Sequence, residues 1–196
     1  MYIWTSKAHC FALSLLLAGC QMEPGAFAAP GQTGAISVLG GAISVAAPSG
    51  YCVDQKSARQ QADGAVVLMG RCSGRSSLAP AVISVTIGAA GSAGVVADGG
   101  AALAAFFQTV GGRAALSRTS MAENVQIVQA ANSDGVFTLR IAEAGVGDYW
   151  RAIVGVSGRL VTLSVQGPAG SSLDAVTGRK LLGASVMAMR SANPLR

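Results

Sequence analysis

The chain has 196 residues, of which 51% are apolar, and it carries a formal net charge of +5. This length and this apolar content are enough for one domain with a hydrophobic core, and they exclude a disordered chain. The Lys and Arg residues are scattered rather than clustered with aromatic residues, which argues against nucleic acid as a partner.

The N-terminus has the parts of an export signal. Lys7 supplies positive charge, an apolar stretch of about a dozen residues runs from Ala8 to Gly19, and small residues follow. A membrane-spanning helix needs about 20 apolar residues, which is more than this stretch provides. We therefore expect residues 1–19 to be a signal peptide.

The end of that signal, Leu17-Ala-Gly-Cys20, resembles the lipobox of bacterial lipoproteins. The resemblance implies that Cys20 receives a diacylglycerol and becomes the first mature residue, so that the protein binds the membrane through a lipid anchor. Gln21 stands where an Asp would retain a lipoprotein at the inner membrane, which implies the outer membrane, facing the periplasm. The alternative is an A-x-A site at Ala26-Phe-Ala28, where cleavage after Ala28 would release a soluble periplasmic or secreted protein.

Two cysteines are left after either cleavage. Cys10 leaves with the signal and Cys20 is lipidated or removed, so Cys52 and Cys72 remain together in an oxidising compartment. We expect them to form a disulfide, worth roughly 3 kcal/mol in the chain-entropy model. The alternative is a redox pair, although such pairs usually have the closer C-x-x-C spacing.

The first part of the mature chain reads as a tether followed by strands. Residues 20–34 are rich in Pro and small residues, which predicts a flexible tether. The repeat of Gly-Ala-Ile-Ser-Val at 34–38 and 41–45 predicts either a Gly-linked hairpin or a strand with a ragged start. Residues 48–50 predict a turn, residues 54–64 a polar loop, and residues 65–72 and 81–88 two strands rich in β-branched side chains.

A helix is predicted over 101–110. Its apolar stripe would be Leu103, Phe106, Phe107 and Val110, and Gly111-Gly112 would end it. Four strands follow, at 125–130, 136–142, 149–156 and 159–166, with 132–135 as a hairpin loop.

The turn at Ser157-Gly158 sets the register of the last two strands. It pairs Val156 with Arg159 and Trp150 with Val165, which places the apolar residues of both strands on one face. A final helix of about 18 residues follows, with a capping box formed by Ser171 and Asp174. Its predicted apolar stripe consists of Leu173, Val176, Leu182, Val186 and Met189.

The element order predicts a single α+β domain over residues 35–192, in which two helices cover an antiparallel sheet of about six to seven strands. Segments including Gly50-Tyr-Cys-Val-Asp54, Gly70-Arg-Cys72 and Tyr149-Trp-Arg-Ala152 resemble a group of uncharacterised small exported proteins of alphaproteobacteria. The element order is also similar to the Mog1/PsbP-like α/β/α sandwich. That resemblance implies a binding or assembly role at a membrane surface.

The residue inventory argues against most enzyme chemistry. The one histidine, His9, lies in the signal peptide, so a mature catalytic triad or a histidine metal site is excluded. The nine acidic residues are isolated, and the glycine-rich segment 88–94 lacks the Lys-Ser/Thr of a phosphate loop. We therefore assign no catalytic residue, no metal and no cofactor.

One candidate site remains. Arg140, Arg151 and Arg159 fall on neighbouring predicted strands and are candidates to hold an anion, with Arg140 and Arg151 pointing away from the apolar face. The alternative is that these arginines only keep an exposed sheet face soluble.

The sequence thus favours a lipid-anchored, non-enzymatic module that binds an envelope protein or another envelope component. The alternatives are a soluble periplasmic or secreted enzyme of unrecognised class, released by cleavage after Ala28, and a carrier of a small ligand.

Overall fold

The computed structural model describes residues 26–27, 34–75, 77–97, 100–169 and 171–194. The expected signal peptide, Cys20 and Ala28 lie outside these residues. Of the expected tether, only Ala26–Phe27 and Gly34 are described. Ala26–Phe27 form strand β1, which pairs in parallel with Arg71 and Cys72.

Seven antiparallel strands form the central sheet, in the order β4-β5-β6-β10-β9-β8-β7. Their bounds are β4 (Tyr51–Gln60), β5 (Ala65–Cys72), β6 (Val82–Ala90), β7 (Val125–Ser133), β8 (Val136–Glu143), β9 (Gly147–Val156) and β10 (Arg159–Gln166). The predicted α+β class and the antiparallel sheet are therefore confirmed.

The predicted register of the last hairpin is also confirmed. Val156 pairs with Arg159, and Trp150 pairs with Val165. The turn residues Ser157 and Gly158 both have positive φ angles, 47° and 73°, as a tight two-residue hairpin requires.

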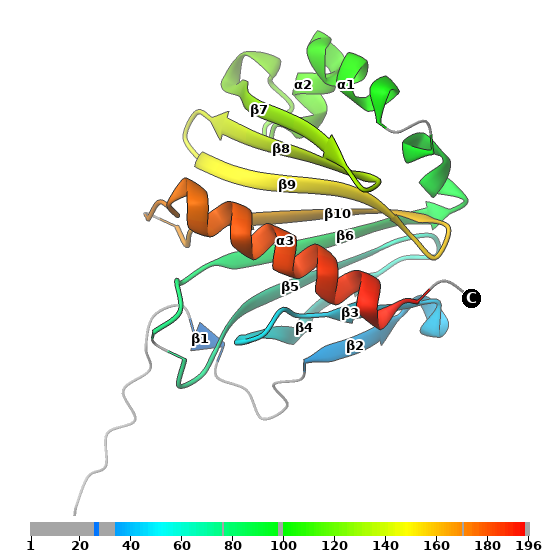
Figure 1. Cartoon of the computed structure of the whole chain (residues 1–196), viewed down its shortest axis with the longest axis vertical. Coiled ribbons are helices and arrows are strands. Elements are labelled where there is room, and N and C mark those ends of the chain that lie inside the picture. The colour runs from blue at the N-terminus through cyan, green and yellow to red at the C-terminus, as the bar shows by residue number, and fades with distance from the viewer. Residues whose placement is uncertain (1–25, 28–33, 76, 98–99, 170, 195–196) are drawn as a thin grey trace, which may run out of the picture.

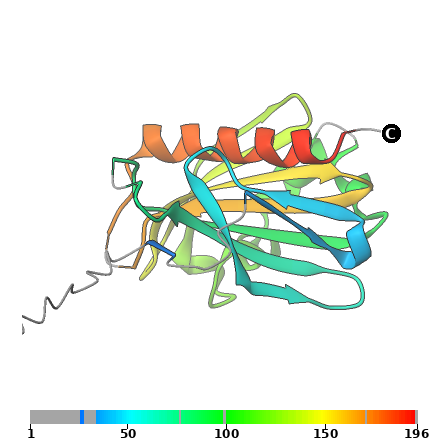
Figure 2. The same cartoon turned by 90° about the horizontal axis from the view of Figure 1, so that it is seen from below.

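Helix α3 (Ala175–Ala192) covers one face of the sheet. Figure 1 shows it crossing in front of β10, β6 and β5 towards β3, and Figure 2 shows it along one side of the sheet. Leu182, Val186 and Met189 of α3 are buried against the apolar faces of β5, β6, β9 and β10. Because this helix can bury its stripe only on the sheet, its packing rather than its helix propensity holds it in place.

A separate hairpin lies beside α3 on the same core. It consists of β2 (Ala35–Val38), the short 3-10 helix η1 (Leu39–Gly41) and β3 (Ile43–Ala46). The side chain of Asn193, just after α3, joins the two: the Ser44 N–H donates to its Oδ1 at 2.9 Å, and its Nδ2 donates to the Ser44 carbonyl at 2.7 Å. Of the two structures expected from the repeated pentapeptide, the hairpin is the one present.

The opposite face of the sheet carries a second core. It is covered by η2 (Ser92–Val96), α1 (Ala101–Gln108), α2 (Val110–Leu116) and η3 (Ala122–Asn124). Leu103, Phe107 and Leu116 from the helices pack with Phe137, Leu139, Ile141, Tyr149 and Ile153 from the sheet. The β9 strand is therefore buried on both faces, whereas one apolar face was predicted.

The predicted helix over 101–110 is wrong at its C-terminal end. The chain turns at Thr109, whose hydroxyl accepts from the Gly112 N–H at 2.9 Å and begins α2. Gly111-Gly112 therefore lie inside a helix, and in the described residues the first of the two predicted helices is followed by a further short helix, α2. Phe106 and Val110 are 45% and 67% exposed, so the predicted stripe is only half buried.

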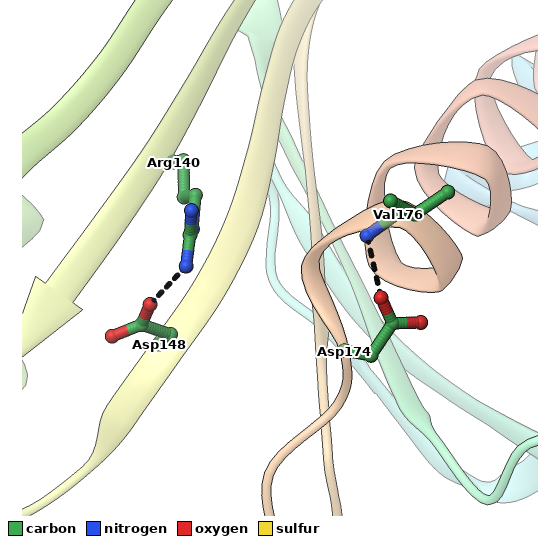
Figure 3. Close-up of polar contacts among 4 residues, drawn as sticks. All are labelled: Arg140, Asp148, Asp174 and Val176. Atoms are coloured by element: carbon green, nitrogen blue, oxygen red, sulfur yellow. Dashed lines mark hydrogen bonds and ion pairs between the residues drawn. The ribbon is translucent and has the colours of Figure 1, made fainter.

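Two further local predictions are corrected. Residues 54–64, expected as a loop, are mostly strand: β4 continues to Gln60 through an irregularity between Asp54 and Arg59. At α3, Asp174 itself is the N-cap, accepting from the N–H groups of Val176 and Thr177 at 2.9 and 3.0 Å. Figure 3 shows the first of these bonds. The α3 residue Val176 is 61% exposed and lies outside the buried stripe.

Cys52 and Cys72 form the expected disulfide. Their Cα atoms lie 5.1 Å apart, at the start of β4 and the end of β5. The bridge therefore fastens one edge of the sheet.

Candidate ligand-binding pocket

The structure does not bring the three candidate arginines together. In the β8–β9 ladder Arg140 pairs with Trp150, and Leu139 pairs with Arg151. Paired residues share a face and successive residues alternate, so Arg140 and Arg151 lie on opposite faces of the sheet. Arg140 is on the α3 face, together with Trp150, and Arg151 is on the face covered by α1 and α2.

Arg140 is engaged in an ion pair. Its Nη2 lies 2.7 Å from Oδ2 of Asp148 on β9, as Figure 3 shows. Its Nε is buried and has no hydrogen-bond partner among the described residues. Arg140 also lines a groove along α3, beside Trp150, Arg179, Lys180 and Met187.

Arg159 is bound to the backbone. Its Nη1 donates to the carbonyls of Gly88 and Asp63 at 2.9 and 3.2 Å. Both carbonyls lie near the ends of other strands, so this arginine fastens strand ends rather than facing a cavity.

Arg151 lines an apolar pocket. Its Nε donates to the hydroxyl of Ser164 at 3.0 Å, and its guanidinium carbon lies 5.4 Å from the centre of the Tyr149 ring. Within the described part of the chain, its terminal nitrogens have no hydrogen-bond partner and no carboxylate lies close enough for an ion pair. Burial lowers the pKa of this guanidinium below its ordinary value, because a charge away from water is disfavoured.

We call this cavity the Arg151 pocket. It lies between the η2–α1–α2 segment and strands β9 and β10, with a volume of about 540 Å³. Its lining is formed by Val95, Ala102, Leu103, Phe106, Phe107, Ala115, Leu116, Arg151, Ile153, Leu160 and Thr162. In Figure 1 its helices α1 and α2 lie beyond β7, at one end of the sheet. The volume falls in the range of small-molecule sites, roughly 300–1,000 Å³.

The helical wall of the pocket is positioned by short-range contacts. The Ser92 hydroxyl accepts from the Leu160 N–H at 2.8 Å, which holds η2 against β10. The Phe107 ring stacks on Phe137, with the ring centres 5.9 Å apart, which holds α1 against β8. The break at Thr109 then turns α2 so that Leu116 reaches the same core.

A buried polar cluster lies next to Arg151. The Glu143 carboxylate accepts from the Arg118 N–H at 2.6 Å and from the Ser117 hydroxyl at 3.0 Å. The Tyr149 hydroxyl lies 3.1 Å from both Glu143 Oε2 and the Leu116 carbonyl. Its single hydrogen donates to one of them at a time. Burial, with the nearby Glu143 carboxylate, raises the pKa of Tyr149 to about 12. These bonds hold the C-terminal end of α2 against β8 and β9.

Sequence reasoning identified Arg151 but missed the walls around it. The glycine-rich segment 88–94, considered above only as a phosphate loop, begins in β6 and ends in η2. The signal that was passed over is the apolar pair Val95-Val96 directly after those glycines. Such a pair at the end of a polar loop indicates that the loop packs back on the sheet.

Two general properties bear on the site. In the described ranges, no group of His, Cys, Asp and Glu side chains gathers in a way that would hold a metal ion. No helix in the same residues is long and apolar enough to cross a membrane.

Comparison with known proteins identifies a similar solved structure and no matching family. No protein-family model matches the chain, and no curated protein matches it significantly. A solved structure of a mutant of the protein Mog1 is similar with a TM-score of 0.45 and 15% identity, covering 81% of this chain and 93% of that chain. At these values the likeness carries no argument about function, and the fold assignment rests on the strand order and layers described above.

Proposed function

We propose that this protein is a non-enzymatic binding module of the bacterial cell envelope that holds a small apolar molecule in the Arg151 pocket. The observation that carries the proposal is the pocket itself, an apolar cavity of ligand size with a cation in its wall. Two of its apolar residues, Val95 and Phe106, are 46% and 45% exposed. Exposed apolar side chains around a concave site favour a bound apolar partner.

The pocket's chemistry supports binding rather than catalysis. Its polar side chains are Arg151 and Thr162, and among the described residues that line it there is no carboxylate, imidazole or thiol. General acid–base catalysis needs a group that titrates near the operating pH. An arginine and a threonine supply donors but no such base.

The place of the protein in the cell is the second part of the proposal. The signal and the lipobox support anchoring of Cys20 in the outer membrane, facing the periplasm, in a protein of the alphaproteobacterial exported group. Mass spectrometry of the mature N-terminus tests this directly. A triacylated Cys20 would support it, and an unmodified N-terminus at residue 29 would replace it with the soluble alternative.

A fluorescent probe tests the binding function. N-phenylnaphthylamine is neutral and apolar and fluoresces when it leaves water. We expect saturable binding of one molecule per chain. Ala115→Phe, which fills the pocket from α2, should abolish it.

The matched control for this variant is Ala105→Phe, an equal change at an exposed alanine of α1 outside the pocket lining. It should leave binding intact. If N-phenylnaphthylamine does not bind, or binds both variants equally well, the pocket is not the binding site.

An envelope protein as a further partner stays a prediction. In-cell crosslinking followed by mass spectrometry would identify it, with the signal-less cytoplasmic form of the chain as the background sample.

A further inference from the structure

The charge in the Arg151 pocket has no counter-ion in direct contact. Glu143 is the buried acid nearby, but its oxygens are occupied by Ser117, the Arg118 N–H and Tyr149. Arg151 itself uses only Nε, on Ser164, and its terminal nitrogens are unpaired within the described residues. An arginine presents five N–H donors in a fixed fork, so most of this donor capacity is unused.

We propose that the Arg151 pocket binds a single-chain amphiphile with one anionic head, which pairs with the Arg151 guanidinium while the apolar tail lies along α1. The proposal rests on the proposed function, since it names the class of ligand for that same pocket.

The hydrogen-bond donors that β9 and β10 present to the pocket indicate the chemistry of the ligand's head group. Ser164 pairs with Arg151 and Thr162 pairs with Ile153 in the β9–β10 ladder, so Arg151 and Thr162 are diagonal neighbours on one face. The Thr162 hydroxyl also lacks a partner among the described residues. A planar guanidinium and a neighbouring hydroxyl match the two oxygens of a carboxylate.

The same inventory limits the charge of the ligand. Among the described residues that line the pocket, Arg151 is the one cation. A dianionic phosphate would leave charge uncompensated next to apolar walls, which is costly. A monoanion matches the single cation.

The apolar wall formed by α1, α2 and η2 indicates where the alkyl tail of the ligand lies. Leu103, Phe107 and Leu116 are buried at the back of the pocket, while Phe106 and Val95 extend the apolar lining outward to solvent. A head fixed at β9 and β10 would therefore direct an alkyl chain across α1 and η2. Each methylene removed from water there contributes about 0.8 kcal/mol.

Displacement of N-phenylnaphthylamine by matched alkyl compounds tests this assignment. Decanoate, decanol and decyltrimethylammonium share one tail and differ in head charge, and each is used below its micelle concentration at neutral pH. We expect decanoate to displace the probe at least tenfold more tightly than decanol, and decyltrimethylammonium to be the weakest.

Two variants test whether Arg151 and Thr162 cause the preference for decanoate over decanol. Arg151→Gln keeps a donor for Ser164 and should remove the preference for decanoate while decanol binds as before. Thr162→Val should reduce decanoate binding a few-fold without changing decanol binding. The matched charge control is Arg179→Gln, an exposed arginine on the α3 face, which should change neither.

The outcomes separate the two proposals. If the neutral probe binds but decanoate and decanol compete equally, or Arg151→Gln keeps the preference, the anionic class is overturned and the pocket function stands. If a short-chain phosphatidylglycerol below its micelle concentration displaces the probe and decanoate does not, the single-chain assignment is overturned. If Arg151→Gln does not fold, the Thr162→Val comparison decides. If no probe binds at all, the proposed function fails as well.

Discussion

The indole ring of Trp150 on β9 lies against the backbone of Gly178, so that no α3 side chain separates the helix from the ring at this point. A Cβ at Gly178 would fall 2.7 Å from Cδ1 of Trp150 and 3.2 Å from its Nε1. Trp150 is only 6% exposed and packs in the core between α3 and the sheet. Glycine at 178 therefore sets how closely the helix approaches the strand.

Because a Cβ at Gly178 would meet Trp150 and one at Gly183 would meet nothing, we expect substitution of these two α3 glycines by alanine to change stability in opposite directions. In Gly178→Ala the added methyl collides with the buried indole, and we expect a net loss of about 1–3 kcal/mol in the free energy of unfolding. At Gly183, a Cβ meets nothing within 4 Å. Gly183→Ala should therefore gain up to about 1 kcal/mol from helix propensity. Urea denaturation of both variants measures the difference, and equal stabilisation by the two would refute the close approach.

Gly111 and Gly112, at the start of α2, test the close packing where the chain turns from α1 into α2. A Cβ at Gly112 would lie 2.0 Å from the Phe106 carbonyl oxygen, and backbone cannot move aside as a side chain can. We expect Gly112→Ala to cost more than about 2 kcal/mol and to weaken probe binding, because α2 forms part of the pocket wall.

The control is the adjacent Gly111→Ala, whose nearest contact would be Thr109 Oγ1 at 3.9 Å. It should be neutral or slightly stabilising. Loss of probe binding in both variants would contradict a specific role for Gly112, because it would show that any substitution at the turn between α1 and α2 disturbs the pocket.

The buried hydroxyl of Tyr149 predicts a loss of stability in alkaline solution. Its pKa is about 12 in the folded protein and 10.0 as the ordinary value. The folded pKa is the higher one, so the contribution is complete below pH 10 and is lost as the pH rises from about 10 to about 12. Allowing for solvent screening, we expect a decline of about 1–2 kcal/mol over this range.

Denaturation of the wild type and of Tyr149→Phe at a series of pH values measures that decline. The variant should be less stable at neutral pH, since Glu143 loses a donor, but the additional alkaline decline should be absent. Tyr51, whose pKa burial also raises, is present in both proteins and cancels in the difference. Identical pH profiles would show that Tyr149 does not titrate as described.

The Cys52–Cys72 disulfide predicts a stability difference between the oxidised and reduced protein. The bridge closes a loop with a sequence separation of 20, and its loss should cost about 3 kcal/mol. Cys52→Ala with Cys72→Ala should behave like the reduced wild type and should be insensitive to reductant. Thiol titration of the denatured, unreduced protein would contradict the pairing if both thiols reacted.

Much of the sheet could be predicted from the sequence, because its strands alternate and its turns are short. The β9–β10 register follows from a turn of two residues and from apolar side chains that agree with it. The β4 strand could not be predicted in the same way. It is an edge strand with polar and largely exposed residues after Asp54, and its pairing with β5 is interrupted there, so no alternation marks it.

The candidate site was predicted only in part for a related reason. The sequence suggested one apolar face for β9, which would have put Arg151 in solvent. In the structure the other face of β9 is covered as well, by helical segments whose rotation is set by Thr109 and by stacking on Phe137. Helical periodicity gives an amphipathic face but not the direction in which tertiary contacts turn it, so Phe106 was expected in the core and lies at the pocket instead.

The paired hydrogen bonds between Ser44 and Asn193 link residues 149 positions apart. The first hairpin of the domain therefore completes its packing only when the last helix has been synthesised and docked. Until then the apolar side chains of Val38, Ile43 and Val45 have no cover from α3. Contacts of such long range slow folding, so the hairpin keeps an uncovered apolar face until the C-terminal helix docks.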